Sequence, residues 1–344
     1  MITHDRFVPV RLKLDDIIPR NSTNTGSISV DGKAPVTFSP LSVLVAGLRE
    51  EIRNDNEKDA RNDLNGFYKI LIDPLVIRGF KPEDFDRLII VPHGPLHYLP
   101  FSALLDAEGK FLVQKTAITI VPSASVWLLL LVRSKAAIRN FVAFGNPLLN
   151  RPDLPSRRAA ESEVKRISEE LTITGPDPKH VYVREEATEE RLQREAPGAN
   201  LLHIATHGEF PDENARDRHG IMLGQGKPED GVVRASTIRK LNLSSNRLVV
   251  LSVCNGGLYR IGPADEPYGL IPAFLQAGSQ NVVGTLWAIE DVYGRLLMTE
   301  FYKRLLKAGP AESLRQASLA FIEERQTIGR WSGFVSVGPE RPFD

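Results

Sequence analysis

The chain has 344 residues, enough to bury one large core or two smaller ones. Hydrophobic residues make up 42% and charged residues 25%, which are ordinary values for a globular protein. The 43 Lys and Arg residues are balanced by 43 Asp and Glu residues, so direct binding of nucleic acid, which needs a basic excess, is not expected.

Cys254 is the only cysteine, which excludes an intrachain disulfide and favours a cytoplasmic location. The longest strongly apolar run, residues 126–132 (VWLLLLV), is far shorter than the roughly 20 residues that cross a bilayer. We predict a buried helix or strand there and no membrane association. The N-terminal residues lack the apolar core of a signal peptide, so secretion is not expected.

The first 77 residues predict a hairpin or loose loop followed by helices. Residues 20–40 are rich in Ser, Thr, Asn and Gly, with short β-branched patches but no helical period. From Leu41 to about Ile77 apolar residues recur at helical spacing. The polar stretch 50–63 within this segment is expected to form a solvated helix face or an interhelical loop.

From residue 87 on, short apolar runs alternate with stretches of helical spacing. Runs of about 4 to 8 apolar residues with β-branched members predict strands that are buried on both faces. The runs lie at 87–94, 141–147, 201–208, 247–257 and 281–291, and the helical stretches at 159–171, 188–196 and 269–278. This alternation predicts βαβ units and a mostly parallel sheet with helices on both faces.

His207 and Cys254 each end an apolar run, and a glycine follows closely after each of them. Functional groups of open parallel sheets collect beyond the carboxyl ends of the strands. The interval between the two residues leaves room for one crossover connection, so adjacent strands would bring imidazole and thiol together. A histidine beside a cysteine favours the nucleophilic thiolate, and the glycines let backbone N–H groups approach a developing oxyanion.

Three other interpretations compete with this one. A lone cysteine after a strand is often a small buried hydrophobe. Zinc binding by the pairs His93/His97 and His203/His207 is disfavoured, because four strand residues span about 13 Å and the prolines around the first pair forbid a regular helix. A cysteine variant of the α/β-hydrolases would place its histidine after the nucleophile, whereas the histidines nearest to Cys254 precede it.

Five stretches resemble, in order, the successive motifs of CHAT domains, a family related to caspases and separases. They lie at 88–104 (LIIVPHGPLHYLPFSAL), 201–210 (LLHIATHGEF), 248–258 (LVVLSVCNGGL), 269–291 (GLIPAFLQAGSQNVVGTLWAIED) and 330–338 (RWSGFVSVG). The resemblance spans roughly residues 64 to 340. It implies a caspase-like three-layer α/β sandwich with a mostly parallel central sheet, preceded by a small N-terminal segment.

By this resemblance, His207 is the general base and Cys254 the nucleophile of a catalytic dyad. The backbone amides of Gly208 and Cys254 form the oxyanion hole, and neither a metal nor an organic cofactor is implied. His93 and His97 are assigned structural roles.

The same resemblance predicts a domain division into three parts. They are an N-terminal hairpin and helical segment (1–63), a degenerate protease-like half (64–150) and a catalytic half (151–344).

Acidic residues that follow the catalytic strands suggest a pocket for a basic P1 residue, the substrate residue before the scissile bond. Asp265 lies in the loop past Cys254, and Asp291 closes a WAIED stretch that resembles separase-like enzymes, which cut after a basic residue. Solvated loop carboxylates would produce the same pattern. A preference for Asp would instead need a pocket arginine, and the candidates are Arg184, Arg260 and Arg295.

We therefore predict a regulated cysteine endopeptidase that cuts a protein substrate in bacterial defence or stress signalling, as the resemblance suggests. CHAT domains often follow helical repeats that sense a partner, so a regulatory or sensor protein is an expected partner. The alternative is a catalytically inactive CHAT scaffold that only binds proteins. The presence of both His207 and Cys254 argues against that alternative.

Overall fold

The computed structural model describes residues 27–28, 36–37, 40–133, 137–175, 178–209, 220–224, 231–254, 259–261, 267–339 and 343. The described chain divides into two compact units. The smaller unit contains the described residues up to Leu88, together with His93–Ala117 and Thr327–Gly329, and the larger unit contains the rest. The functional division expected at residues 63 and 150 stays a prediction.

The smaller unit is mainly helical. Strands β1 and β2 pair antiparallel in the described part of the segment predicted as a hairpin. Helices α1 and α2 then bury apolar side chains at the predicted helical spacing, among them Leu48, Ile52, Leu64 and Phe67. The elements of this unit are β1 (Ser27–Ile28), β2 (Val36–Thr37), α1 (Pro40–Arg53), α2 (Glu57–Leu71), α3 (Asp73–Val76), α4 (Leu112–Lys115) and the 3₁₀ turns η2 (Pro82–Asp84), η3 (Gly94–Tyr98) and η4 (Phe101–Ala103).

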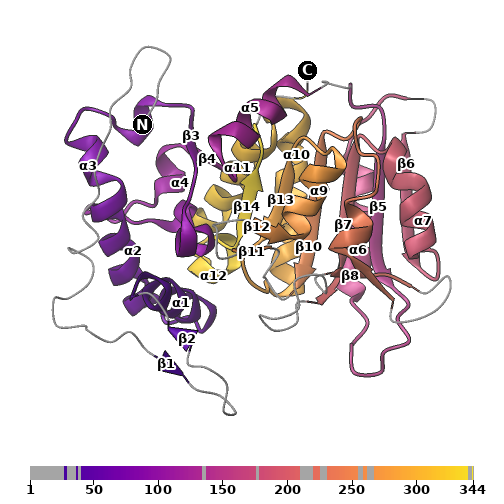
Figure 1. Cartoon of the computed structure of the whole chain (residues 1–344), viewed down its shortest axis with the longest axis horizontal. Helices are drawn as coiled ribbons and strands as arrows, with labels where there is room; N and C mark the ends of the chain where they lie inside the picture. The colour runs from indigo at the N-terminus through magenta and orange to yellow at the C-terminus, as the bar shows by residue number, and fades with distance from the viewer. Residues whose placement is uncertain are drawn as a thin grey trace. The chain divides into compact units, whose positions relative to one another are not determined.

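One sheet, nearly all of it in the larger unit, has the strand order β3-β4-β14-β13-β10-β7-β5-β6 (Figure 1). Neighbours from β13 to β6 run parallel, β14 runs antiparallel to β13, and β8 with β9 extends from β7 as an antiparallel pair. The mostly parallel sheet is therefore confirmed. The strands are β3 (Arg87–Ile90), β4 (Ala117–Ile120), β5 (Phe141–Pro147), β6 (Lys179–Arg184), β7 (Leu201–Glu209), β8 (Gly220–Met222), β9 (Val232–Arg234), β10 (Leu248–Cys254), β13 (Val282–Thr285) and β14 (Phe334–Val337), with β11 (Tyr259–Ile261) and β12 (Pro267–Gly269) as a separate pair.

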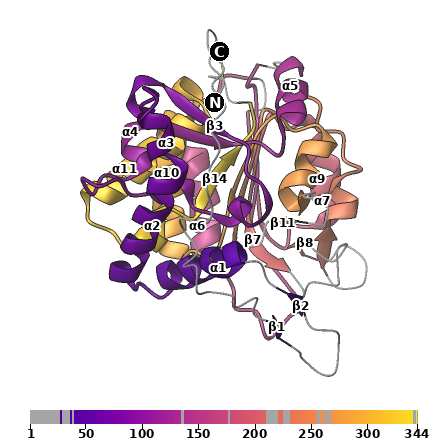
Figure 2. The same cartoon turned by 60° about the vertical axis from the view of Figure 1, so that its left-hand side comes forward.

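Helices cover both faces of this sheet, which completes the three layers (Figure 2). Helices α6, α10 and α11 lie on one face, and α7 and α9 lie on the other. The helices of the larger unit are α5 (Ala124–Val132), α6 (Arg158–Glu170), α7 (Glu189–Glu195), α8 (Ala235–Ile238), α9 (Leu270–Ala277), α10 (Asp291–Ala308) and α11 (Pro310–Glu323), with the 3₁₀ turn η5 (Ala196–Gly198) and with α12 (Ile328–Trp331), which links the two units along the chain. The three helices predicted from helical spacing, α6, α7 and α9, are confirmed to within a residue at each end.

The central strands form where the sequence places its unbroken apolar runs. All seven residues of β5 are buried, because helices cover both faces of the sheet at that point. Gly145 in β5 allows helix α6 to approach closely, since a Cβ atom there would lie 2.7 Å from a methyl carbon of Val164 and 2.9 Å from the carbonyl oxygen of Ala160.

Two predictions about the apolar runs need correction. The run at 126–132 is helical, in α5, but it is not buried: Leu128 is 58% exposed and Val132 is 80% exposed, whereas Leu130 is buried. A helix that is apolar all round carries no information about which side meets the core. The run at 281–291 forms a strand only in its first half, because β13 ends at Thr285 and Trp287 lies two residues beyond it.

Candidate functional site

The carboxyl ends of β7 and β10 bring the two candidate catalytic residues to one place. The two strands are adjacent and parallel, and their register pairs Leu201 with Leu248 at one end and His207 with Cys254 at the other. Neighbouring strands lie about 4.8 Å apart, so these two backbone positions are direct neighbours. The single crossover that the sequence predicted between adjacent parallel strands is confirmed.

The imidazole of His207 is partly exposed and is oriented by a backbone carbonyl. Its Nε2 lies 2.9 Å from the carbonyl oxygen of Pro155, in the loop before α6. A carbonyl oxygen only accepts hydrogen bonds, so Nε2 carries the hydrogen in the neutral ring and Nδ1 carries the lone pair. Fixing the tautomer through one nitrogen is how proteins prepare the other nitrogen of a histidine for proton transfer.

Asn146 holds the loop that presents Pro155. Its side-chain oxygen accepts hydrogen bonds from Ser156 Oγ at 3.0 Å and from the backbone N–H of Arg157 at 2.8 Å. Its Nδ2 donates to Glu161 on α6 at 3.0 Å. Asn146 has a φ of 46°, a left-handed conformation that costs energy outside glycine and that clusters at functional sites.

Arg157 forms a partly buried ion pair with Asp291 close to the ends of these strands. Its guanidinium binds both carboxylate oxygens of Asp291, the first residue of α10, and donates to the carbonyl oxygens of Thr206 at 2.5 Å and Ser252 at 3.4 Å. The Arg157 side chain is only 7% exposed. Arg157 thereby links the loop before α6 to β7, β10 and α10, which are far apart in the sequence.

Burial and this ion pair set the protonation of His207. Burial lowers the pKa of His207 because the charged imidazolium loses solvation, and the positive charge of Arg157 lowers it further. The hydrogen bond to Pro155 and the charge of Asp291 act in the opposite direction without reversing the shift. The ring therefore stays neutral, and able to accept a proton, to a lower pH than an ordinary histidine.

Two hollows flank these residues. One, of about 240 Å³, is lined by His207 and by the apolar side chains of Pro147, Leu148, Leu149, Leu154 and Pro155, with Arg158 and Arg184 at its edge. The other, beside Arg157 and Asp291, has only about 10 Å³, roughly the space of one water molecule. The guanidinium of Arg157 fills the space next to the Asp291 carboxylate.

The other residues predicted from the sequence lie in different places. Gly208 follows His207 within β7. Asp265 falls outside the described residues, and so do the side chains of Cys254 and Arg260. Arg184 and Arg295 line a further hollow next to the one beside His207.

Arg157 is the site residue that sequence reasoning missed. It lies between Ser156 and Arg158, just before a predicted helix, where a charged residue is ordinarily solvated. Only the contact with Asp291, far away in the chain, reveals its position.

The histidine pairs do not come together as ligand sets. His203 and His207 both lie on strand β7, as predicted, and His203 bonds to Glu163 and Tyr302 instead of sharing a partner with His207. His97 is a buried member of the 3₁₀ turn η3, whereas His93, which precedes that turn, is exposed. Within the described ranges no group of three or more His, Cys, Asp or Glu side chains is arranged to hold a metal ion. Nor do those ranges contain a helix of the length and apolarity that a membrane span requires.

The CHAT domain family model matches residues 61–339 of the sequence. The chain belongs to the CHAT domain family. Tetratricopeptide repeat protein 28 of Homo sapiens is 25% identical over 337 residues, and its counterpart in Mus musculus is 25% identical over 343 residues. Each alignment covers 82% of this chain but only 13% of the relative, so the CHAT chain corresponds to a small part of those proteins.

Two solved structures share the fold of the CHAT chain. The separase-securin complex of Saccharomyces cerevisiae matches with a TM-score of 0.51 and 19% identity, over 73% of this chain and 15% of that one. The Arg-specific cysteine proteinase gingipain R (RgpB) matches with a TM-score of 0.51 and 10% identity, over 87% and 74% of the two chains. At these identities the likeness is one of fold, and that fold is the caspase-like α/β sandwich.

Proposed function

We propose that this CHAT domain is a cysteine endopeptidase in which His207 and Cys254 form the catalytic dyad. The observation that carries the proposal is the register of β7 and β10, which pairs the two residues at the carboxyl edge of a caspase-like sheet. The hydrogen bond from His207 to Pro155 adds the orienting partner that a catalytic base needs.

The proposed reaction follows from the tautomer of His207. Nδ1 takes the thiol proton of Cys254, and the thiolate attacks the scissile carbonyl carbon, forming a C–S bond and an oxyanion. As the oxyanion collapses, the C–N bond breaks and the amine leaves with the proton from His207. Water then attacks the thioester, His207 takes its proton, the C–S bond breaks, and the thiol and a carboxylic acid product remain.

The backbone amides of Gly208 and Cys254 are the proposed donors to the oxyanion. Cys254 ends β10, and Gly208 lies near the end of the adjacent strand β7, where it pairs with Ile221 of β8, so the sheet fixes both backbones before substrate arrives. Donors that need no reorganisation stabilise the developing charge most strongly, and removing one typically costs about 100- to 1,000-fold in rate.

The proposed specificity is a preference for Arg or Lys at P1. Asp291 binds the basic side chain, and Asp265 contributes further negative charge. The surroundings of Asp291 suit a guanidinium, because its carboxylate and the carbonyl oxygen of Thr206 already bind one, that of Arg157. A basic P1 side chain therefore has to displace Arg157 or share Asp291 with it. The competing preference, for Asp at P1, rests on Arg184, which lines the hollow beside His207.

We further propose that a sensor protein regulates this peptidase. Its proposed role is in bacterial defence or stress signalling, within the cytoplasm. The catalytically inactive scaffold remains the competing function, and one experiment separates the two. An electrophilic peptide probe, such as an acyloxymethyl ketone with Arg at P1, is incubated with the full chain, and the labelled residue is found by mass spectrometry.

We expect labelling at Cys254 that disappears in His207→Ala, because an unactivated thiol reacts slowly. Cleavage of a peptide substrate is expected to survive chelators and to stop after thiol alkylation, since Cys254 is the only thiol. Equal labelling of wild type and His207→Ala would favour the scaffold, with Cys254 as an ordinary accessible thiol.

A further inference from the structure

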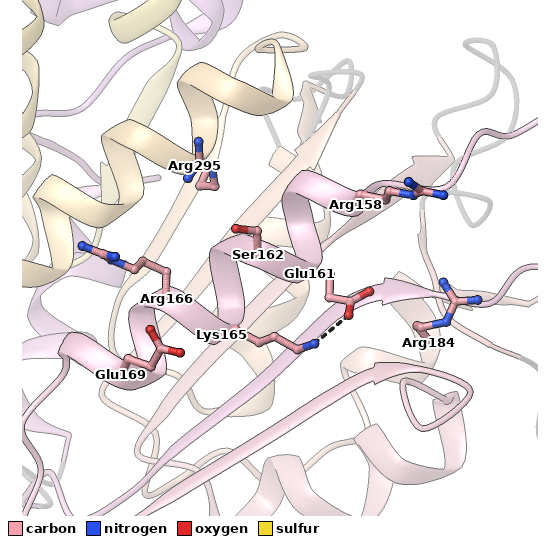
Figure 3. A pocket seen from close by; sticks show the side chains of 8 residues that line it. All are labelled: Arg158, Glu161, Ser162, Lys165, Arg166, Glu169, Arg184 and Arg295. Carbon is pink, nitrogen blue, oxygen red and sulfur yellow. Dashed lines mark hydrogen bonds and ion pairs between the residues drawn. The ribbon is translucent and has the colours of Figure 1, made fainter.

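Charged side chains of α6 and its neighbours line a basic pocket (Figure 3). This pocket shares Arg158 and Arg184 with the hollow beside His207. A hollow of about 670 Å³ is lined by five cationic side chains and two acidic ones, with Ser162 between them: Arg158, Lys165, Arg166, Arg184 and Arg295, and Glu161 and Glu169. We call these residues the basic pocket. Its cations come from α6, from the end of β6 and from α10, so the fold assembles them.

The pattern of α6 explains why these side chains face outwards. Ala160, Val164 and Ile167 recur at helical spacing and are buried on the side of α6 that faces the sheet, so the charged residues on the opposite side lie in solvent. Lys165 is 52% exposed, Arg166 57% and Arg184 46%. The cations of the basic pocket are therefore accessible to a ligand.

The charges within the basic pocket are only partly compensated. Lys165 pairs with Glu161 at 2.7 Å, as Figure 3 shows, and Arg166 pairs with Glu170 at 2.5 Å. Both are exposed pairs one helical turn apart, which are weak and easily exchanged for another anion. No carboxylate of the described ranges forms an ion pair with Arg158 or Arg295.

The basic pocket adjoins the hollow beside His207. Arg158 and Arg184 line both hollows, so one extended ligand bound along them would contact both. Arg184 ends β6 with a φ of 52°, a left-handed conformation that a non-glycine residue adopts at an energetic cost. Its carbonyl oxygen accepts a hydrogen bond from the backbone of Leu148, which fixes the edge shared by the two hollows.

We propose that the basic pocket binds an acidic segment of the protein substrate and so positions the scissile bond at the dyad. This inference rests on the proposed peptidase function, because it takes the hollow beside His207 as the substrate cleft. A polypeptide fits better than a nucleic acid or a polyphosphate, because the hollow beside His207 is lined by prolines and leucines that suit amino-acid side chains. Val292 and Leu296, exposed on the same helix as Arg295, offer further apolar contacts.

The test measures binding without catalysis. The full chain carrying Cys254→Ala is titrated with a fluorescein-labelled peptide that contains a run of Glu residues, and anisotropy is compared with that of the same peptide carrying Gln. Lys165→Gln with Arg166→Gln neutralises two cations of the basic pocket. The matched control, Arg194→Gln with Lys240→Gln, removes two exposed cations that do not line it.

We expect the Glu peptide to bind at least about tenfold more tightly than the Gln peptide, because the contacts are charge-assisted. The pocket variant should lose most of that difference, the control should keep it, and added salt should weaken binding because the contacts are exposed. Circular dichroism checks that both variants fold.

Three outcomes overturn the inference: equal affinity for the two peptides, equal loss in the control variant, or tighter binding of an oligonucleotide or polyphosphate that depends on the same cations. Cleavage of short peptides without acidic residues should be unchanged in the pocket variant of the active chain. Failure of the dyad would leave the binding result intact, and failure of the basic pocket would leave short-peptide cleavage intact.

Discussion

His203 and His207 lie four residues apart on the same face of β7, yet their surroundings are opposite. His203 is completely buried, and both of its ring nitrogens are engaged: Nε2 lies 2.9 Å from Glu163 on α6, and Nδ1 lies 3.1 Å from the hydroxyl of Tyr302 on α10. His207, at the strand end, is partly exposed, and among the described residues only Pro155 bonds to its ring.

The difference shows that position along the strand, more than residue type, decides what a histidine does. In the middle of β7 the layers of helices close over the imidazole, and every polar atom must find a partner inside the protein. Burial and the charge of Glu163 raise the pKa of Tyr302 well above its ordinary value, so its hydroxyl keeps its proton. At the strand end the layers open, and the ring is accessible from solvent.

The largest expected effect is the loss of activity when His207, at the exposed end of β7, or Cys254 is replaced. Cys254→Ala and His207→Ala should each lower kcat/KM on a validated peptide by at least about 1,000-fold, and the double variant should lose little more, because the two residues act as a unit. The midpoint of urea unfolding should stay near that of wild type. Near-wild-type turnover by His207→Ala would show that the dyad assignment is wrong.

The second-largest expected effect is a loss of stability when the buried partner of His203 is removed. Glu163→Ala leaves His203 without its carboxylate partner in a closed interior, so we expect a loss of about 2 to 4 kcal/mol in the free energy of unfolding. Urea denaturation measures it, and Glu169→Ala, an exposed carboxylate on the same helix, is the matched control. A midpoint shift as small as that of the control would mean that the network contributes no stability.

The third prediction concerns the ion pair between Arg157 and Asp291. Asp291→Ala should reduce the preference for Arg or Lys at P1 by about tenfold or more, as expected for the loss of a charge-assisted contact. Arg157→Ala should improve acceptance of basic P1 residues, because it frees the carboxylate and the space that Arg157 fills. A peptide library profiled against both variants decides the matter, and enrichment of Asp at P1 in wild type would favour the competing preference.

The smallest expected effect is a shift of the pH profile. Because the pKa of His207 is lowered, its ring stays neutral below the ordinary pKa, and kcat/KM should fall only as the pH drops through that lowered value. Arg157→Gln removes a nearby cation and unpairs Asp291, and both changes raise the pKa of His207. The acid limb should therefore move to higher pH in this variant. An unmoved limb would mean that another group controls it.

The sequence by itself determined the order and the type of the main elements. Unbroken apolar runs predicted β5, β7 and β10 because strands covered on both faces have no polar side, and helical spacing predicted α6 because one of its faces meets the sheet. In the sequence, His207 and Cys254 each follow an apolar run and are closely followed by a glycine, and this pattern predicted that both lie at strand ends. These features are local, so a window of a few residues contains them.

Only the tertiary structure decided which of these elements meet and what their side chains touch. The register that pairs His207 with Cys254, the contact of Arg157 with Asp291 and the enclosure of His203 by Glu163 all join residues that are distant in the chain. Periodicity shows which side of an element is buried but not which partner covers it. The uniformly apolar run of α5 lacks even that signal, and its exposure could be learned only from the folded chain.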